Sequence, residues 1–323
     1  GTVGPLLNLW STSLDREVAL GTQPLPFASG FRLVWSLIPP TGFSTVTAQS
    51  FSEFGHPTGR RWTLSPPGGK HVAYLTSAAR RRDAGAWIVA ADTSISCNPT
   101  CPGGRNVYVR AISEDGQPTS PYRRVDDGHV HGELLGGPSS IGSRSNGGAV
   151  VAWGAIDEPF EGGEIRARLI GPQAGLLGSE IQVNTFTDHQ QACPNLGVRP
   201  DDGFFIEWLS NQQDGSRSGH YYQRFDAAAS RFGVETRLDS NIADADQCGD
   251  FAMDPHGNFV AVWTTTPIPS PNCSDVVGRL FRADGTPIGP DFHLAKDFGP
   301  CEEAPRVTFG PNGIITAVWQ RFN

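Results

Sequence analysis

Tryptophan recurs along this chain at an almost constant interval. The members of the series are Trp35, Trp87, Trp153, Trp208, Trp263 and Trp319. The last four are separated by 55, 55 and 56 residues, the first two by 52, and the second and third by 66. Each stands in a short apolar run that follows a turn, as in "GAVVAW" and "NFVAVW". A period of this length is typical of a repeat protein in which each copy is one supersecondary unit.

Each copy reads as four short strands. Around Trp263 they are "DFAMDP", "FVAVW", "VVGRLFRA" and "DFHLAK", with the turns "HGN" and "DGTPIGP" between them. Short strands, Asp-Gly turns and the lack of helical periodicity predict an all-β chain. Four-stranded antiparallel units at a fixed period predict the blades of a β-propeller. Six copies predict a six-bladed β-propeller.

The predicted blades fill the whole chain as one propeller domain, residues 1–323. Their approximate bounds are 23–65, 70–127, 133–184, 195–240, 250–296 and 304–323. The last blade has only two strands, "APRVTF" and "IITAVW". The N-terminus supplies two unassigned pieces within residues 5–22, "PLLNLW" and "EVALGT". We expect these N-terminal strands to complete the C-terminal blade and close the ring, because an open sheet edge invites aggregation.

The copy from Gly147 to Asn184, "GGAVVAWGAIDEPFEGGEIRARLIGPQAGLLGSEIQVN", carries the clearest pattern. It resembles bacterial secreted or periplasmic β-propeller repeat proteins, whose repeats run roughly G-f-V-V-v-W, I-x-A-R-x-F and E-x-x-V-N. The resemblance concerns architecture and implies no particular activity, because propellers carry enzymes, lectins and scaffolds. Each repeated Trp is expected to be structural, with its ring buried between blades. The alternative is that these rings stack on sugars, as Trp does in some propeller lectins.

Composition narrows the possible partners. A net charge of −8 argues against nucleic acid, whose phosphates need clustered basic residues. No run approaches the roughly 18 apolar residues that cross a membrane. The chain begins at Gly1 without Met, and we expect a removed signal peptide, lipid anchor or membrane helix upstream. Contact with a membrane would therefore run through a partner or such an N-terminal anchor.

Six cysteines point to disulfides. They are Cys97, Cys101, Cys193, Cys248, Cys273 and Cys301. None stands in a paired zinc arrangement, and an even number favours disulfides in a periplasmic, secreted or cell-surface protein. The repeat places all six on one face of the disc. We expect Cys97–Cys101 as a local pair and, of three possible arrangements of the rest, Cys193–Cys248 with Cys273–Cys301.

Two loops carry candidate binding groups. His129 and His131 lie in a long insertion beside Asp127, and His-x-His on a strand directs both rings to one side, as a metal site needs. Glu133 is a second candidate for the third ligand. The alternative is an exposed polar loop, which we prefer because no complete ligand set is visible; we therefore expect no metal and no cofactor.

The second candidate is the run Arg80, Arg81 and Arg82, in the turn between the first two strands of the second blade. That turn should lie on the face opposite the cysteines. Three adjacent guanidinium groups could bind carboxylates or phosphates of a partner. The alternative is an ordinary solvated turn.

No nucleophile elbow, phosphate loop or zinc-protease motif is present, and no local motif selects an acid–base pair. The loops after the Trp strands share almost nothing, which does not fit a repeated sugar site. The sequence therefore predicts a non-enzymatic scaffold that docks on a membrane-associated protein assembly. One alternative is a carbohydrate-binding propeller, with Tyr221, Tyr222 or Phe43 stacking on sugars. The other is a secreted hydrolase or lyase.

Overall fold

The computed structural model describes residues 18–27, 30–38, 45–64, 71–94, 105–127, 139–155, 163–215, 217–240, 245–266, 274–294, 301–310 and 312–322. Every regular element in these ranges is a strand. In chain order they are β1 (Val18–Phe27), β2 (Gly30–Ile38), β3 (Thr45–Ser52), β4 (Pro57–Thr63), β5 (His71–Arg80), β6 (Ala86–Ser94), β7 (Arg105–Ile112), β8 (Arg123–Arg124), β9 (Ser140–Ser143), β10 (Ala149–Ala155), β11 (Glu164–Ile170), β12 (Leu176–Gln182), β13 (Gln191–Val198), β14 (Phe204–Asn211), β15 (Ser218–Phe225), β16 (Arg231–Arg237), β17 (Ala245–Met253), β18 (Phe259–Thr266), β19 (Asp275–Phe281), β20 (Phe292–His293), β21 (Cys301–Phe309) and β22 (Ile315–Phe322). None of the described ranges contains a helix that could cross a membrane.

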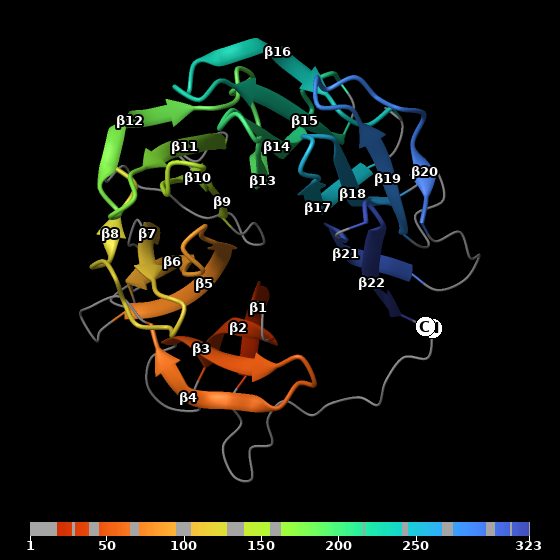
Figure 1. The fold of residues 1–323 in the computed structure, drawn as a ribbon. Coiled ribbons are helices and arrows are strands. Elements are labelled where there is room, and N and C mark those ends of the chain that lie inside the picture. Colours follow the sequence, from red (N-terminus) through yellow and green to blue (C-terminus); the bar gives the residue numbers. More distant parts are fainter. Residues whose placement is uncertain are drawn as a thin grey trace.

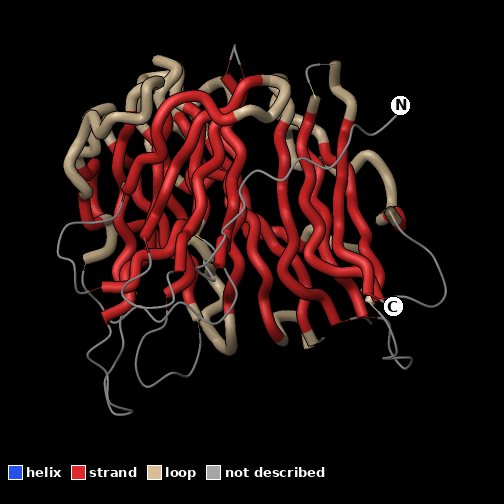
Figure 2. The backbone as a smooth tube through the Cα atoms, turned by 90° about the horizontal axis from the view of Figure 1, so that it is seen from below, coloured by secondary structure: helices blue, strands red, loops and turns tan. Residues whose placement is uncertain are grey.

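The strands form antiparallel sheets arranged around a central axis (Figure 1). β1–β4, β5–β8, β9–β12, β13–β16 and β17–β20 make five four-stranded blades, and β21 and β22 make a two-stranded sheet. One parallel bridge between Ser218 and Ala245 joins the sheets of the fourth and fifth blades. The first strand of each group lies nearest the axis and the fourth lies at the rim. Seen from the side, the strands run between the two faces of the disc (Figure 2). The molecule is therefore an all-β propeller of four-stranded antiparallel blades, as predicted.

Burial between blades explains why the second strands read as continuous apolar runs. All of Ala149–Trp153 in β10 is buried, as is Phe259–Trp263 in β18. Both faces of a blade pack on neighbours, so neither face can be polar. Between the fourth and fifth blades, Phe205 packs on Phe259 with ring centroids 4.9 Å apart. The outer strands are exposed instead, and β12 and β16 begin with four exposed residues each.

The predicted count of six complete blades is not met in the described residues, which hold five and a two-stranded sheet. The assignment of residues 18–22 to the last blade is wrong. They open β1, in which Val18 pairs with Ile38 and Leu20 with Ser36, so the first blade begins at Val18. "PLLNLW" lies outside the described residues. The pairing forms because "VALGTQPLPF" is long enough to run the full length of β2 beside it.

The uneven Trp spacing has a structural cause. In β2, β10, β14 and β18 the Trp stands at one position of the second strand, where it pairs with Thr47, Arg166, Tyr221 and Val277. In the second blade that position is Ala90, which pairs with Tyr108. Trp87 stands three residues earlier and therefore belongs to a different position. Both kinds of Trp are buried, whereas Trp319 is 36% exposed on β22.

The E-x-x-V-N motif joins neighbouring blades. Its last residue accepts an N–H near the start of the third strand in the same blade: Asn184 Oδ1 lies 2.8 Å from Ile165 N and Asp239 Oδ1 lies 2.7 Å from His220 N. Its Glu reaches the preceding blade, where Glu235 Oε2 accepts the Thr185 N–H at 2.5 Å. Glu180 accepts the Asp127 N–H in the same way. The motif is thus framework, because it satisfies backbone groups at each blade junction.

Candidate active site

The innermost strands of the fourth blade, the fifth blade and the two-stranded sheet begin with polar residues at one equivalent position. Gln191 of β13 pairs with Ser210, Asp246 of β17 with Thr265, and Glu302 of β21 with Arg321. The equivalent residues of the first two blades are Ala19 and Ala73. The exposed fractions are 0% for Gln191, 6% for Asp246 and 2% for Glu302. Three buried polar groups therefore stand on the face where the innermost strands begin.

Gln191 has a structural task within this group. Its side-chain amide donates to the carbonyl of Asp188 at 3.1 Å and its Oε1 accepts the Trp208 indole N–H at 3.2 Å. Both ends of the amide are thereby satisfied. Gln191 fixes the Trp of its blade and the loop before β13, and it has no group left to act on a ligand.

The two carboxyl groups are not satisfied in this way. Asp246 Oδ2 and Glu302 Oε2 have no hydrogen-bond partner within the described part of the chain. Burial raises the pKa of Asp246 to about 7, although the charge of His220 acts in the opposite direction. An acid with a pKa near neutrality can hold or release a proton under ordinary conditions. Buried carboxyl groups with free oxygens are costly for folding and are typical of functional sites.

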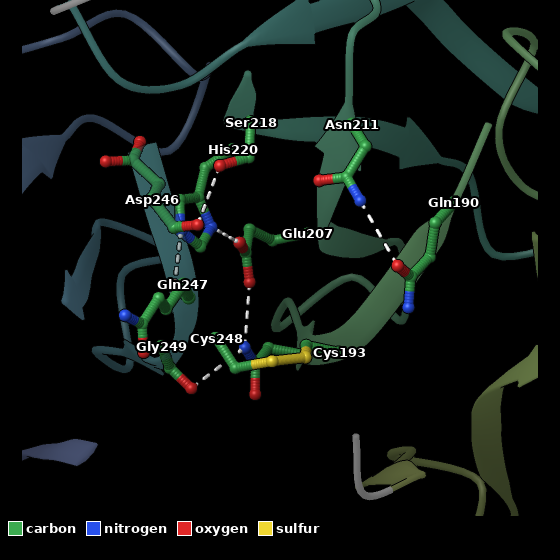
Figure 3. The surroundings of a disulfide bond; sticks show 11 residues. Gln190, Cys193, Glu207, Asn211, Ser218, His220, Asp246, Gln247, Cys248 and Gly249 are labelled. Atoms are coloured by element: carbon green, nitrogen blue, oxygen red, sulfur yellow. Dashed lines mark hydrogen bonds and ion pairs between the residues drawn. A yellow bond between two sulfur atoms is a disulfide. The ribbon is translucent and has the colours of Figure 1, made fainter. Parts of the chain in front are cut away.

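A buried ion pair stands beside Asp246. Glu207 of β14 contacts His220 Nδ1 of β15, and both residues are 2% exposed. Burial alone would lower the pKa of His220, but the charge of Glu207 and its hydrogen bond raise it to about 9. His220 Nε2 lies 3.1 Å from the carbonyl oxygen of Gln247, and its ring lies 5.2 Å from that of Trp263. The imidazolium is therefore held between two blades (Figure 3).

The pair replaces apolar residues of the framework. In the other blades the position of Glu207, one before the repeated Trp position, is held by Val34, Val89, Ala152 and Val262. The backbone carbonyl of His220 accepts a hydrogen bond from the N–H of Leu238, the residue that follows the outer strand β16. In the other blades the residues that accept the equivalent bond are Val46, Val107, Ile165 and Val276. Sequence reasoning passed over this pair, although "FFIEW" against "AVVAW" and "FVAVW" already contains the signal.

A disulfide fastens the same region. Cys193 of β13 is bonded to Cys248 of β17, with a Cα–Cα distance of 5.6 Å, as predicted (Figure 3). The bond joins the innermost strands of the fourth and fifth blades two residues after Gln191 and Asp246. Cys301 is also disulfide-bonded. Its predicted partner Cys273, and the predicted pair Cys97–Cys101, lie outside the described residues.

The predicted metal candidates are not brought together here. His129, His131 and Glu133 lie outside the described residues. Asp127 binds Arg168 Nη1 at 2.6 Å, so its carboxylate serves the blade junction. The described ranges contain no cluster of three or more His, Cys, Asp or Glu that could hold a metal.

Arg80 ends β5, and Arg81 and Arg82 follow it in the turn to β6, on the face where this innermost strand ends rather than where it begins. Arg81 is paired with Asp83 at 2.8 Å and lies 4.7 Å from the Trp87 ring centre. Its guanidinium is therefore engaged within its own turn. Binding of a partner by Arg80, Arg81 and Arg82 stays a prediction that the structure does not test.

The two tyrosines expected to stack on sugars do not expose their rings to solvent. Tyr221 and Tyr222 are buried in the interfaces on either side of the fourth blade. The Tyr222 hydroxyl donates to the carbonyl of Gly285 at 3.2 Å. These rings therefore belong to the core, while Phe43 lies outside the described residues.

Comparison with solved structures supports the architecture. A protein of unknown function from Dyadobacter fermentans superposes over 95% of this chain and 96% of its own, with a TM-score of 0.61 and 13% identity. An α-L-arabinofuranosidase of Fusarium graminearum, in complex with an iminosugar inhibitor, covers 78% of this chain and 77% of its own at a TM-score of 0.54 and 12% identity. A Penicillium chrysogenum α-L-arabinanase, in complex with arabinobiose, has the same coverage, with a TM-score of 0.50 and 14% identity. No protein-family model and no curated sequence matches the chain.

These comparisons overturn the prediction of a non-enzymatic scaffold. The two neighbours described above that carry an activity in their names are an α-L-arabinofuranosidase, solved with an iminosugar inhibitor, and an α-L-arabinanase, solved with arabinobiose. Nothing in the described residues supports docking on a membrane-associated protein assembly.

Proposed function

We propose that this chain is a carbohydrate-active propeller that hydrolyses glycosidic bonds. The observation that carries the proposal is the pair Asp246 and Glu302. They are two buried carboxyl groups at the same position of neighbouring innermost strands, each with one unpartnered oxygen. Glycosidases use two such carboxyl groups, one on each side of the bond that breaks. The likeness in fold to an arabinofuranosidase and an arabinanase makes arabinose-containing glycans the first substrates to test.

The roles follow from the surroundings of each group. Asp246, whose pKa is raised to about 7, would protonate the glycosidic oxygen as the bond to the anomeric carbon breaks. Glu302 would act on the anomeric carbon, either by taking a proton from the attacking water or by attacking directly. In either route one water is added, and the proton lost by Asp246 is regained. The anomer formed first would distinguish the two routes.

The test is an activity screen with matched variants. Wild-type protein would be assayed on arabino-oligosaccharides, on 4-nitrophenyl α-L-arabinofuranoside and on a panel of other glycosides. We expect hydrolysis that Asp246→Asn and Glu302→Gln each reduce to a small residual rate. Glu303→Gln is the control, because Glu303 adjoins Glu302 but has the Ser274 hydroxyl within hydrogen-bonding distance. Binding of sugars without hydrolysis, or full activity in both variants, would contradict the proposal.

We also propose that the ring has six blades, with residues 5–17 completing the sheet of β21 and β22. β21 packs against β17 and β18, so the two-stranded sheet occupies the position of a further blade. The outer edge β22 carries exposed apolar residues, including Val318 and Phe322. Amide hydrogen exchange tests this: β22 should exchange slowly in the full chain and rapidly after deletion of residues 1–17. Rapid exchange of β22 in the full chain would rule it out.

The disulfides and the fold neighbours support location in an oxidising compartment, that is, a secreted or periplasmic protein. A glycosidase that acts on polymeric glycans outside the cytoplasm would also have to be in such a compartment.

A further inference from the structure

The Glu207–His220 pair has no counterpart in the first, second, third and fifth blades, and His220 contacts the carbonyl of Gln247, the residue that follows Asp246. The pair occupies positions that are apolar in the first, second, third and fifth blades. A buried ion pair is often no more stabilising than apolar residues of similar volume. Retention of charge at one blade junction therefore calls for a reason other than stability.

The backbone at Asp246 is held from the fourth blade at two consecutive carbonyl groups. The Ser218 hydroxyl donates to the Asp246 carbonyl at 2.7 Å, and His220 Nε2 lies 3.1 Å from the Gln247 carbonyl (Figure 3). A protonated His donates from both ring nitrogens, so the bond to Gln247 persists while Glu207 occupies Nδ1. Asn195 Nδ2 lies 2.8 Å from the other oxygen of Glu207, which fixes that carboxylate in turn.

The charges that face Asp246 come from three elements. His220 on β15 and Arg237 at the end of β16 favour its ionised form, and Asp239 after β16 opposes it. Thr265 on β18, which pairs with Asp246, contributes a hydroxyl. Asp239 and Arg237 bind each other at 2.5 Å, so their effects oppose one another. His220 is thus the cation that most directly offsets the burial of Asp246.

We propose that Glu207 and His220 are positioning residues: they clamp the start of β17 and hold a positive charge beside Asp246. Neither residue reacts with substrate. The inference rests on the proposed function for its catalytic consequence, but the clamp and the charge can be measured without any substrate.

The test returns the fourth blade to the pattern of its neighbours. In Glu207→Val/His220→Val both positions take the residue found in the fifth blade, namely Val262 and Val276. We expect this variant to fold with unchanged or greater stability in urea. In wild-type protein labelled with ¹³C-carboxyl aspartate, Asp246→Asn assigns the Asp246 signal. In the double variant that signal should titrate about one pH unit higher or more, because the nearby positive charge is lost.

Activity gives the second readout. The double variant should lose roughly 10- to 100-fold in kcat with little change in KM, because a displaced acid slows the chemical step and leaves binding intact. The basic limb of its pH profile should move to higher pH.

The single variant Glu207→Gln tests the effect of the negative charge alone. Glutamine has nearly the same shape and can keep the hydrogen bond to His220 Nδ1, but it carries no charge. A stably folded double variant with an unchanged Asp246 titration would overturn the inference. If the wild-type chain hydrolyses no glycoside, the proposed function fails, yet the titration and the urea curves still decide the positioning role.

Discussion

Asp246 and Glu302 stand at the same position of two neighbouring innermost strands, one paired with Thr265 and the other with Arg321. Equivalent positions of a repeat protein ordinarily carry framework residues. Here two of them carry buried acids, at the face where the strands begin. Repetition of the fold therefore places two groups that are 56 residues apart in sequence at equivalent positions of neighbouring strands.

Activity should depend on pH through Asp246. Because the proposed acid must be protonated, and burial raises its pKa to about 7, the rate should fall as the pH rises above about 7. The residual activity of Asp246→Asn should lack this limb. The check is kcat/KM from pH 4 to 9 for both proteins. An identical basic limb in the variant would show that another group titrates.

Stability should also depend on pH, and the sign follows from two groups. The pKa of Asp246 is raised by burial, so the folded state binds its proton more tightly than the unfolded chain does. Its contribution is present below about pH 4 and is lost as the pH rises through about 7. Burial lowers the pKa of His220, but the charge and hydrogen bond of Glu207 raise it to about 9. The protonated His220 therefore stabilises the fold fully below its usual pKa of 6.5, and this stabilisation is lost as the pH rises towards 9.

The wild-type chain should therefore become less stable from pH 5 to pH 9. Each pKa unit between the folded and unfolded states corresponds to about 1.4 kcal/mol. We expect Asp246→Asn to gain about 2–4 kcal/mol relative to wild type between pH 4 and pH 7, measured by urea unfolding at both values. A constant difference between the two proteins would contradict the raised pKa of Asp246.

The blade-joining Glu offers a test of the framework. Glu235→Ala removes the acceptor of the Thr185 N–H and hydroxyl, at 2.5 and 2.7 Å. We expect a loss of about 1–2 kcal/mol in the free energy of unfolding. Glu235→Gln keeps one acceptor oxygen and should lose less. Equal losses would mean that charge, rather than the hydrogen bond to the backbone, joins the blades.

The sequence sufficed for the fold because the repeat is written in local patterns. The Trp position, the turn residues and the E-x-x-V-N motif each mark a strand or a junction that recurs. Spacing alone misled at Trp87, which stands three residues away from the position of the other Trp. The sequence also misled at residues 18–22, which were predicted to complete the last blade. They are the first residues of β1 and pair with β2 in the first blade instead.

The candidate site could not be read in the same way. Asp246 and Glu302 form no sequence motif, although each precedes the Trp of its own repeat by 17 residues, and this spacing alone does not show that both carboxyl groups are buried. The Glu207–His220 pair was visible as a departure from the apolar pattern. Its meaning required the contact across the blade junction, which no local pattern encodes. The candidate site therefore lies at positions where the copies differ, and the contacts that connect these positions are visible only in the folded structure.

The disulfide gives the last prediction. Cys193 and Cys248 enclose a separation of 55 residues, so their bond restricts a long loop of the unfolded chain. Chain-entropy arguments give about 4 kcal/mol for a loop of this length. Cys193→Ala/Cys248→Ala should lower the free energy of unfolding by about that amount, measured in urea without reductant.

The same variant bears on the site, because the bond ties β13 to β17 two residues after Asp246. We expect kcat to fall at temperatures well below the unfolding midpoint, since the start of β17 loses one of its attachments to the fourth blade. Dithiothreitol added to the wild type should reproduce both effects, and the double variant should not respond to it further through this bond. If the variant is destabilised but fully active, the attachments made by Ser218 and His220 are sufficient to hold Asp246 in place.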